Sequence, residues 1–383
     1  MPTPAHPRPL VVFADDWGRH PSSAQHLIRQ LLPTRPVVWV NTIGTRPPRL
    51  DRQTARRVAG KLRGWTRRPA SVATDHAPSP VVLNPKMWPA FASPLARRLN
   101  RALLARCLTP VLESLPAPPV VVTTLPLVAD LVGKLPAAKW VYYCVDDFSV
   151  WPGYDGPTML RMERDLVAKI DRAVAVSDTL VEHLAELGRP AELLTHGVDL
   201  AHWRVPPDAG RPPEFVGIPG PWVLFWGVID RRLDLDFLRH LSARPAAGSV
   251  VLIGPQEDPD PALFTLPRVF VRPAVAYARL PALAQAAAVL VMPYADAPVT
   301  RAMQPLKMKE YLATGRSCVV RALPSTRPWA DALDVADSPA AFMALVIERL
   351  TSGVPAAQTQ ARGRLAAEGW AAKAAVFAGW LDE

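Results

Sequence analysis

The chain has 383 residues, more than one ordinary hydrophobic core accommodates, so we expect two domains of under about 200 residues each. Apolar residues make up 49% of the sequence, yet no apolar run approaches the roughly 18 residues of a membrane-spanning helix. The three cysteines, Cys107, Cys144 and Cys318, are far apart, which argues against a disulfide framework and a zinc site. The N-terminal segment MPTPAHPRPLVVFADDW lacks the features of a signal peptide, so we expect a cytoplasmic protein.

The net charge of +10 is concentrated in one segment. Residues 46–106 contain 14 Lys or Arg against two acids, Asp51 and Asp75, so this segment carries +12 and the remainder −2. Such a patch is typical of a protein with an anionic partner, although a solvated arginine-rich surface is the alternative. Its basic residues are interleaved with apolar ones around Trp65 and Leu99, as in helices that lie on membrane surfaces. We therefore predict docking onto an anionic membrane surface. No nucleic-acid partner is expected, because no recognised nucleic-acid-binding module accompanies the segment.

In the first half of the chain, short continuous apolar runs alternate with amphipathic stretches. Continuous apolar strands are buried on both faces, which is typical of parallel sheets covered by helices. The expected strands are residues 9–14, 36–41, 81–85, 119–124, 139–145 and 172–177. The helices expected between them are Ser22–Leu32, Ser93–Leu115 and Thr158–Ile170, and Ser22 and Ser23 are plausible helix caps.

A second series of strands and helices follows a proline-rich break between Pro206 and Pro221. Its expected strands are residues 222–228, 249–254, 268–272, 288–294 and 317–321, and its expected helices are 234–243, 277–287 and 305–314. This organisation predicts an α/β fold with two tandem doubly wound, Rossmann-like domains whose strand ends face a central cleft. We expect the domains at residues 1–200 and 201–357. The final segment, 358–383, is expected to be helical and to pack back on the N-terminal domain.

The helix that begins at Pro305 and ends before Gly315 is the most informative segment. Lys307 lies in its first turn and Arg301 lies just before it, although a cation at the positive end of a helix dipole is unfavourable. A bound anion removes this conflict, and a helix N-terminus flanked by Lys or Arg suits a diphosphate. Glu310 lies on the same side of the helix, where a carboxylate can accept both hydroxyls of a ribose. An exposed amphipathic helix with surface charges is the alternative.

This segment, PLKMKEYLATGRSCVV, resembles the nucleotide-sugar-binding motif of family-four-type GT-B glycosyltransferases, in which Glu310 corresponds to the ribose-binding glutamate. Many members carry a second glutamate eight residues earlier, where this chain has Ala302. The Pro-Leu-Lys form is similar to a subgroup found in exopolysaccharide assembly. The resemblance implies a GT-B fold with the acceptor in the first domain and the nucleotide sugar in the second. It also implies a retaining, metal-independent reaction and no cofactor beyond the nucleotide-sugar substrate.

Three further segments extend the resemblance over about residues 120–350. WGVIDRRLDLDFL resembles the first strand and loop of the donor domain, in which a glycine turn precedes basic residues that reach the diphosphate. Arg232 is the preferred match, because Arg231 can equally pair with nearby aspartates. VVLIGP resembles the next strand, and LLTHGVDLAHW, which contains His196, resembles the interdomain hinge. The implied donor-binding residues are Gly227, Arg231, Arg232, Gly254, Arg301, Gln304, Pro305, Lys307 and Glu310.

Asp146 and Asp147 follow the buried strand Trp140–Val145, at the end expected to face the cleft. A carboxylate there can orient or deprotonate an acceptor hydroxyl, and similar enzymes often carry an acidic residue after this strand. We select Asp146, although strand alternation allows Asp147 and both could be turn-forming aspartates. Asp16 and His20, in the loop after the first strand, are further catalytic candidates. Adjacent aspartates can bind a metal, but none is expected, because GT-B enzymes usually neutralise the leaving diphosphate with protein cations.

These features predict a glycosyltransferase that moves a sugar from a nucleotide-diphosphate sugar to a saccharide or polyprenyl-diphosphate-linked acceptor. The expected setting is extracellular polysaccharide or cell-envelope glycan assembly at the inner face of the plasma membrane. A nucleotide-sugar epimerase of the same fold is an alternative, but it leaves the basic segment unexplained. Ala302 motivates a second alternative, a non-catalytic GT-B partner subunit. The nucleotide, UDP or GDP, and the sugar stay open.

Overall fold

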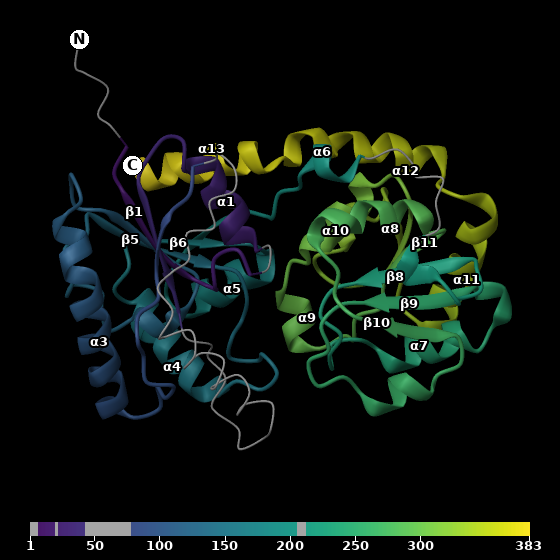
Figure 1. The fold of residues 1–383 in the computed structure, drawn as a ribbon, viewed down its shortest axis with the longest axis horizontal. Helices are drawn as coiled ribbons and strands as arrows, with labels where there is room; N and C mark the ends of the chain where they lie inside the picture. Colours follow the sequence, from purple (N-terminus) through teal and green to yellow (C-terminus); the bar gives the residue numbers. More distant parts are fainter. Residues whose placement is uncertain (1–6, 20–21, 43–77, 205–211) are drawn as a thin grey trace, which may run out of the picture.

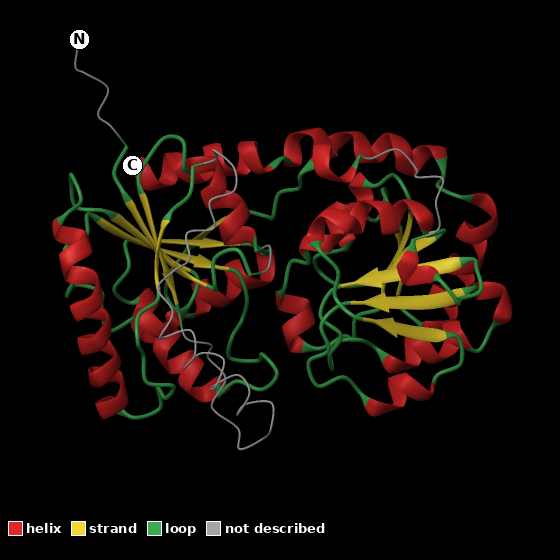
Figure 2. Ribbon diagram, in the orientation of Figure 1, coloured by secondary structure: helices red, strands yellow, loops and turns green. Residues whose placement is uncertain are grey.

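A computed structural model describes residues 7–19, 22–42, 78–204 and 212–383. It contains two α/β lobes that lie side by side (Figure 1). Each lobe is a twisted sheet with helices on both faces (Figure 2). Neighbouring strands in both sheets pair in parallel, in agreement with the continuous apolar runs of the sequence. The predicted fold class, two tandem doubly wound domains, is therefore confirmed.

The N-terminal sheet has the order β3-β2-β1-β4-β5-β6-β7 within the described ranges. Its strands are β1 (Leu10–Ala14), β2 (Val37–Asn41), β3 (Val81–Leu83), β4 (Val120–Thr123), β5 (Lys139–Cys144), β6 (Arg172–Ala175) and β7 (Ala191–Leu193). The α-helices of this lobe are α1 (Ser23–Leu31), α3 (Pro94–Glu113), α4 (Gly156–Val167) and α5 (Asp178–Glu186).

The C-terminal sheet has the order β10-β9-β8-β11-β12-β13. Its strands are β8 (Trp222–Trp226), β9 (Ser249–Ile253), β10 (Val269–Arg272), β11 (Val289–Met292), β12 (Ser317–Arg321) and β13 (Asp334–Ala336). The helices are α6 (Leu200–Trp203), α7 (Leu235–Ser242), η5 (Tyr277–Arg279), α8 (Leu280–Ala286), α9 (Pro298–Ala302), α10 (Leu306–Ala313) and α11 (Pro339–Ser352). After these come α12 (Ala356–Ala361), the 3-10 stretch η7 (Arg362–Glu368) and α13 (Trp370–Asp382).

The helix boundaries follow local capping chemistry. Ser22 caps α1 by accepting a hydrogen bond from the Gln25 backbone nitrogen (3.4 Å), as predicted. Pro305 is the N-cap of α10 rather than its first residue, so that prediction is wrong by one position. The expected final helix is divided at Gly369, the N-cap of α13. The strands β7 and β13 are not predicted by the sequence, because each contains an acidic residue, Glu192 or Asp334, and forms no continuous apolar run.

Helix α13 leaves the C-terminal lobe and lies across the N-terminal one (Figure 1). Its buried residues Trp370, Phe377 and Leu381 belong to the hydrophobic core of the N-terminal lobe. Arg35 donates two hydrogen bonds to the carboxylate of Asp382 (2.7 and 3.0 Å). Residues far apart in the sequence therefore form one core.

The junction between the lobes is held by Lys309 of α10, whose side chain is buried. Its Nζ donates to Thr195 Oγ1 (3.1 Å), to the carbonyl of His196 and to the carboxylate of Glu368. Burial lowers the pKa of Lys309 to about 8, although Glu368 opposes this shift. These contacts attach α10 to the predicted hinge.

Among the described residues, no single helix is long and apolar enough to cross a membrane. Helix α11 and the stretch Ala356–Glu368 reach the required length only as a pair, and the chain bends by 94° between them.

Candidate functional site

The ends of β8 and β9 meet the start of α10 at two glycines. Gly227 follows β8 with a φ of 136°, and a Cβ at this position would collide with the side chain of Lys307. Gly254 follows β9 and lies so close to the carbonyl oxygen of Gly227 that no side chain fits there. The two glycines thus allow the backbone and Lys307 to approach each other at the strand ends.

Lys307 is a cation that lies beside Gly227. Its Nζ lies over the rings of Phe225 (4.5 Å) and Tyr294 (4.9 Å) and donates to the Tyr294 hydroxyl. Within the described part of the chain, it has no carboxylate within ion-pair distance. A cation in the first turn of a helix without an acidic partner is arranged to meet an anion.

Arg232 is buried, with 9% of its surface exposed. It donates to the carboxylate of Asp230 (3.0 and 2.9 Å), and its guanidinium lies 4.7 Å from the ring centroid of Trp151. Trp151 belongs to the loop after β5 in the other lobe, so this cation–π contact joins the two lobes. Arg232 is therefore placed between the lobes at the ends of their sheets.

Arg231 and Arg301, also predicted to bind the donor, lie elsewhere. Arg231 is exposed and pairs with Asp260 (3.2 Å). Arg301, on α9, is exposed and pairs with Asp296 through two bonds of 2.5 and 2.9 Å. Both charges have surface partners, so the structure does not bring these residues into the group around Lys307 and Arg232.

Glu310, on α10, is 8% exposed and holds two hydrogen bonds. Its Oε2 accepts from Trp226 Nε1 (3.3 Å), and its Oε1 accepts from the Tyr277 hydroxyl (3.0 Å). Burial raises the pKa of Glu310 to about 7, against the effect of the two donors and of Lys307. Gln304 and Pro305 are also buried at the start of α10.

Ala302 occupies the position where many similar enzymes have a second glutamate. It is buried, and its carbonyl accepts a hydrogen bond from the Ser177 hydroxyl of the N-terminal lobe (2.6 Å). This position therefore lies at the contact between the lobes.

The adjacent residues Asp146 and Asp147 have different surroundings. Asp146 is partly buried and is attracted by Arg232 of the opposite lobe. Desolvation raises the pKa of its carboxyl to about 7, with Arg232 opposing and Asp147 reinforcing the shift. Asp147 turns back on its own loop, where Oδ1 accepts from the backbone nitrogen (2.9 Å) and hydroxyl (2.6 Å) of Ser149.

Asp147 also lies near Glu163 and His183, and the possible ligand atoms of these three residues are within 4.8 Å of one another. Glu163 Oε2 is 2.8 Å from His183 Nε2, and Glu163 Oε1 accepts from the Tyr142 hydroxyl (2.7 Å). The hydrogen bond to Glu163 raises the pKa of His183. This side-chain set could hold a divalent metal, but its hydrogen bonds also explain the arrangement without one.

The loop after β1 contains the remaining catalytic candidates. Asp16 is paired with Arg19 at the surface (3.3 Å), and the loop is attached to β2 by a bond from the Trp17 backbone nitrogen to Asn41 Oδ1 (2.9 Å). His20 lies outside the described residues.

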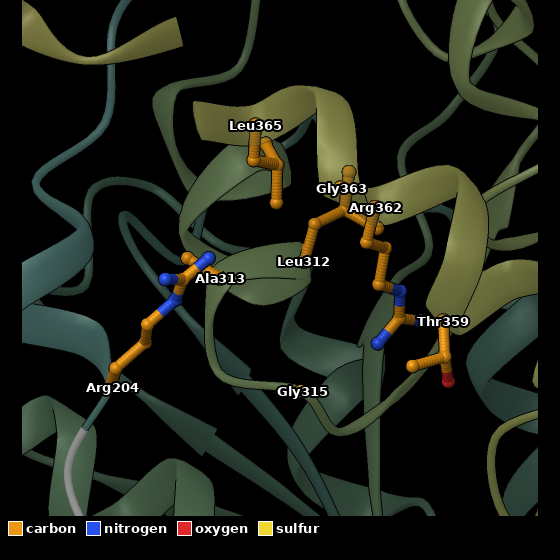
Figure 3. Close-up of a pocket in the computed structure, with 8 residues that line it drawn as sticks. All are labelled: Arg204, Leu312, Ala313, Gly315, Thr359, Arg362, Gly363 and Leu365. Atoms are coloured by element: carbon orange, nitrogen blue, oxygen red, sulfur yellow. The ribbon is translucent and has the colours of Figure 1, made fainter. Parts of the chain in front are cut away.

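A separate pocket of about 220 Å³ lies on the C-terminal lobe, beside Gly315 and η7 (Figure 3). Arg362 lines it, but its guanidinium donates to the backbone carbonyls of Ala332 and Arg316 (both 2.9 Å). Gly315 precedes β12, so this pocket lies at the opposite end of the sheet from Gly227 and Gly254. It does not join the site at the strand ends.

The sequence does not predict Trp151 or Tyr277 as site residues. Trp151 is in a loop and Tyr277 begins a 3-10 turn after β10, so neither belongs to a recognisable spacing. The one feature of the sequence that could have pointed to them is an aromatic residue in the segment after a strand, and this feature is too common to identify a site.

Sequence comparison identifies no relative, because no family model and no curated protein matches the chain. Solved structures do resemble it over nearly its whole length. Sucrose-phosphate synthase from Thermosynechococcus elongatus has a TM-score of 0.70 at 15% identity, covering 97% of this chain and 98% of that one. Anabaena HepE in complex with UDP and glucose has a TM-score of 0.62 at 12% identity, with 98% and 96% covered. Trehalose-6-phosphate synthase from Burkholderia multivorans has a TM-score of 0.60 at 15% identity, with 98% of both chains covered. At these identities the likeness shows the fold, and the fold is GT-B.

Proposed function

We propose that the protein is a glycosyltransferase that moves a sugar from a nucleotide-diphosphate sugar onto a hydroxyl of a saccharide or polyprenyl-diphosphate-linked acceptor. The observation that carries the proposal is the contact of Arg232 of one lobe with Trp151 in the loop after β5 of the other, a loop that also carries Asp146 near enough for Arg232 to affect its pKa. Transfer between two bound substrates requires a base for the acceptor hydroxyl and a cation for the donor diphosphate to lie close together.

On the donor side, Arg232, Lys307 and the N-terminus of α10 hold the diphosphate. Breaking the bond between the sugar carbon and the diphosphate oxygen leaves negative charge on the phosphate. Preorganised cations and a helix terminus stabilise this charge as it develops. Gly227 and Gly254 let the backbone come close to the nucleotide, and Glu310 accepts the ribose hydroxyls.

On the acceptor side, Asp146 accepts the proton of the attacking hydroxyl, and the new glycosidic bond forms on the face of the sugar from which the diphosphate departs. A pKa of about 7 gives this carboxyl useful basicity near neutral pH. We further propose a retaining, metal-independent reaction in exopolysaccharide or cell-envelope glycan assembly, on the cytoplasmic face of a membrane. These refinements rest on the motif with Pro305, Leu306 and Lys307 and on the basic segment.

The test uses purified protein with UDP-, GDP- and ADP-sugars, each with and without saccharide acceptors. UDP-glucose is the first donor, because the Anabaena HepE structures contain UDP, UDP-glucose, or UDP with glucose. Thermal-shift measurements identify the nucleotide that binds, since a ligand of the folded state raises its apparent stability. We expect nucleoside diphosphate release that requires an acceptor. Conversion of the donor alone would support an epimerase, and nucleotide binding without any turnover would support a non-catalytic subunit.

A further inference from the structure

The carboxyl of Glu310 is surrounded by an aromatic frame that comes from three separate segments. Tyr277 donates to Oε1 from the turn after β10, and Trp226 donates to Oε2 from the end of β8. The ring of Tyr277 stacks on His202 of α6, with centroids 4.4 Å apart and an interplanar angle of 2°. Trp203, also of α6, stacks on Trp226 (5.2 Å, 9°) and meets Tyr277 edge to face (5.5 Å, 89°).

This frame fixes both donors and, through them, the plane of the carboxyl. An ionised carboxylate has about four lone-pair sites, and here each oxygen uses one of them. Among the described residues no other donor reaches these oxygens, so one site on each is left for a further donor. A buried carboxyl with a fixed plane and one free site per oxygen suits two neighbouring hydroxyls, because the hydroxyl spacing then matches the oxygen spacing.

The two donors differ in their surroundings. Trp226 is buried in the core of the C-terminal lobe, with 4% of its surface exposed. Tyr277 is only partly buried, and its hydroxyl donates to Glu310 from outside the buried core. The hydroxyl of Tyr277 can therefore be removed without disturbing the core, which makes its contribution measurable.

We propose that Tyr277 is a positioning residue for nucleoside recognition, which holds Glu310 so that the carboxylate accepts both hydroxyls of a ribose. The inference rests on the proposed function, in which Glu310 is the ribose ligand. Its consequence is discrimination between ribonucleotides and deoxyribonucleotides, a property that a merely structural tyrosine would not affect.

The experiment measures the affinity of the full chain for a nucleoside diphosphate and its 2′-deoxy counterpart by calorimetry. The probes are UDP and 2′-deoxy-UDP, or the GDP or ADP pair if thermal shift favours that base. The variants are Tyr277→Phe, Glu310→Gln and the double variant, and Tyr143→Phe is the matched control, because it removes a hydroxyl from the core of the other lobe. Thermal unfolding establishes that each variant is folded.

We expect the unaltered protein to prefer the ribonucleotide by about tenfold or more, the effect of one hydrogen bond to a charged group. Glu310→Gln should abolish most of this preference. Tyr277→Phe should reduce this preference by about threefold or more, with little change in the affinity for the 2′-deoxy nucleotide. The double variant should resemble Glu310→Gln. The control variant Tyr143→Phe should keep the preference of the unaltered protein.

Three outcomes would overturn the inference, and they are distinguishable. If Glu310→Gln loses the preference while Tyr277→Phe keeps it, Glu310 binds ribose but Tyr277 does not position it. If Tyr277→Phe binds both nucleotides more tightly, the tyrosine occupies the site rather than shaping it. If Glu310→Gln keeps the full preference, or no nucleotide binds, the proposed donor site itself is wrong.

Discussion

Neighbouring residues of the same type have different surroundings in this protein. Arg231 and Arg232 are adjacent, yet Arg231 lies at the surface beside Asp260, whereas Arg232 is buried between Asp230 and Trp151. An exposed ion pair contributes little, because water and salt screen it. The guanidinium of Arg232, although paired with Asp230, lies between the lobes, where we propose that the donor diphosphate binds. Substitution of Arg231 therefore serves as a control for substitution of Arg232, because both remove one positive charge.

We expect Arg232→Ala and Lys307→Ala each to weaken nucleoside diphosphate binding by about ten- to a hundredfold. This is the loss of a charge-assisted hydrogen bond of about 1.5–3 kcal/mol. Arg231→Ala removes the same charge from the surface and should change affinity by less than about twofold. Titration calorimetry at fixed ionic strength measures all three. Similar losses in all three variants would mean that only the net charge of the lobe matters.

The fall of the reaction rate at low pH, the acid limb of the pH–rate profile, should report the protonation of Asp146. Its pKa is raised to about 7, so its base form is lost as the pH falls through 7, and the rate should fall about tenfold per pH unit below that. Because Glu310 also titrates near 7, the single-turnover rate is measured at saturating donor. Asp146→Asn should cut the rate by about two to four orders of magnitude and remove the limb.

Asp147→Asn is the matched control for this measurement, since the carboxylate of Asp147 accepts hydrogen bonds from Ser149 in its own loop. It should keep the acid limb and most of the rate. The reverse pattern, with the loss confined to Asp147→Asn, would place the base on the other aspartate. If both variants are fully active, Asp16 and His20 are the next residues to test.

At the scale of elements, the C-terminal helix determines how the lobes are joined. Trp370, at its start, stacks on His26 of α1 with centroids 4.9 Å apart and an interplanar angle of 6°. Phe377 packs against Tyr143 of β5 at 5.6 Å. The last residues of the chain thus complete a core whose sheet is built from its first half.

We expect Phe377→Ala to destabilise the N-terminal lobe by about 3–5 kcal/mol, the usual cost of removing a buried aromatic side chain. Val376→Ala on the same helix is the control, because Val376 is 49% exposed and should cost under about 0.5 kcal/mol. Denaturant unfolding with a probe in each lobe measures the effect. Equal destabilisation by both substitutions would contradict the packing role of Phe377, and helix propensity could not explain it, because alanine is a better helix former than Val or Phe.

At the scale of the whole molecule, the excess positive charge lies in the basic segment, residues 46–106, which the structure describes only in part. Residues 46–77 of the basic segment lie outside the described ranges, and α3 carries most of the remaining basic residues. Helix α3 lies at the outer edge of the N-terminal lobe (Figure 1). Leu95 is 74% exposed and Leu99 is 45% exposed, beside the exposed Arg98 and Arg101. Exposed leucines among arginines are typical of helices that lie at a membrane interface.

We expect the protein to co-sediment with vesicles that contain anionic lipid, increasingly with anionic content and less at high salt. Each basic residue near such a surface contributes about 1 kcal/mol, and screening limits its reach to about 8 Å at physiological ionic strength. The double variant Leu95→Glu and Leu99→Glu should lose most of this binding. Phe264→Glu, at an exposed apolar position of the other lobe, should not. Equal binding to neutral vesicles, or none at all, would leave the segment as a solvated arginine-rich face.

The sequence by itself determined the two parallel sheets, most helix boundaries, and the placing of Lys307 and Glu310 on one helix. These features follow from local chemistry, because a strand buried on both faces needs a continuous apolar run and a helix needs its caps. The sequence left the directions of Arg231, Arg232, Asp146 and Asp147 open. Residues beyond a strand end no longer follow its alternation, so packing decides which of two neighbours points inward.

Only the tertiary structure brought Trp151 to Arg232 and Tyr277 to Glu310. Each pair joins segments from different elements, and no spacing along the chain encodes their meeting. Their contacts arise because parallel strands place all their carboxyl ends at one edge, so loops distant in sequence share one small volume. The physical reason is general, since sequence patterns specify which face of an element is buried, whereas the partner on that face depends on how whole elements pack.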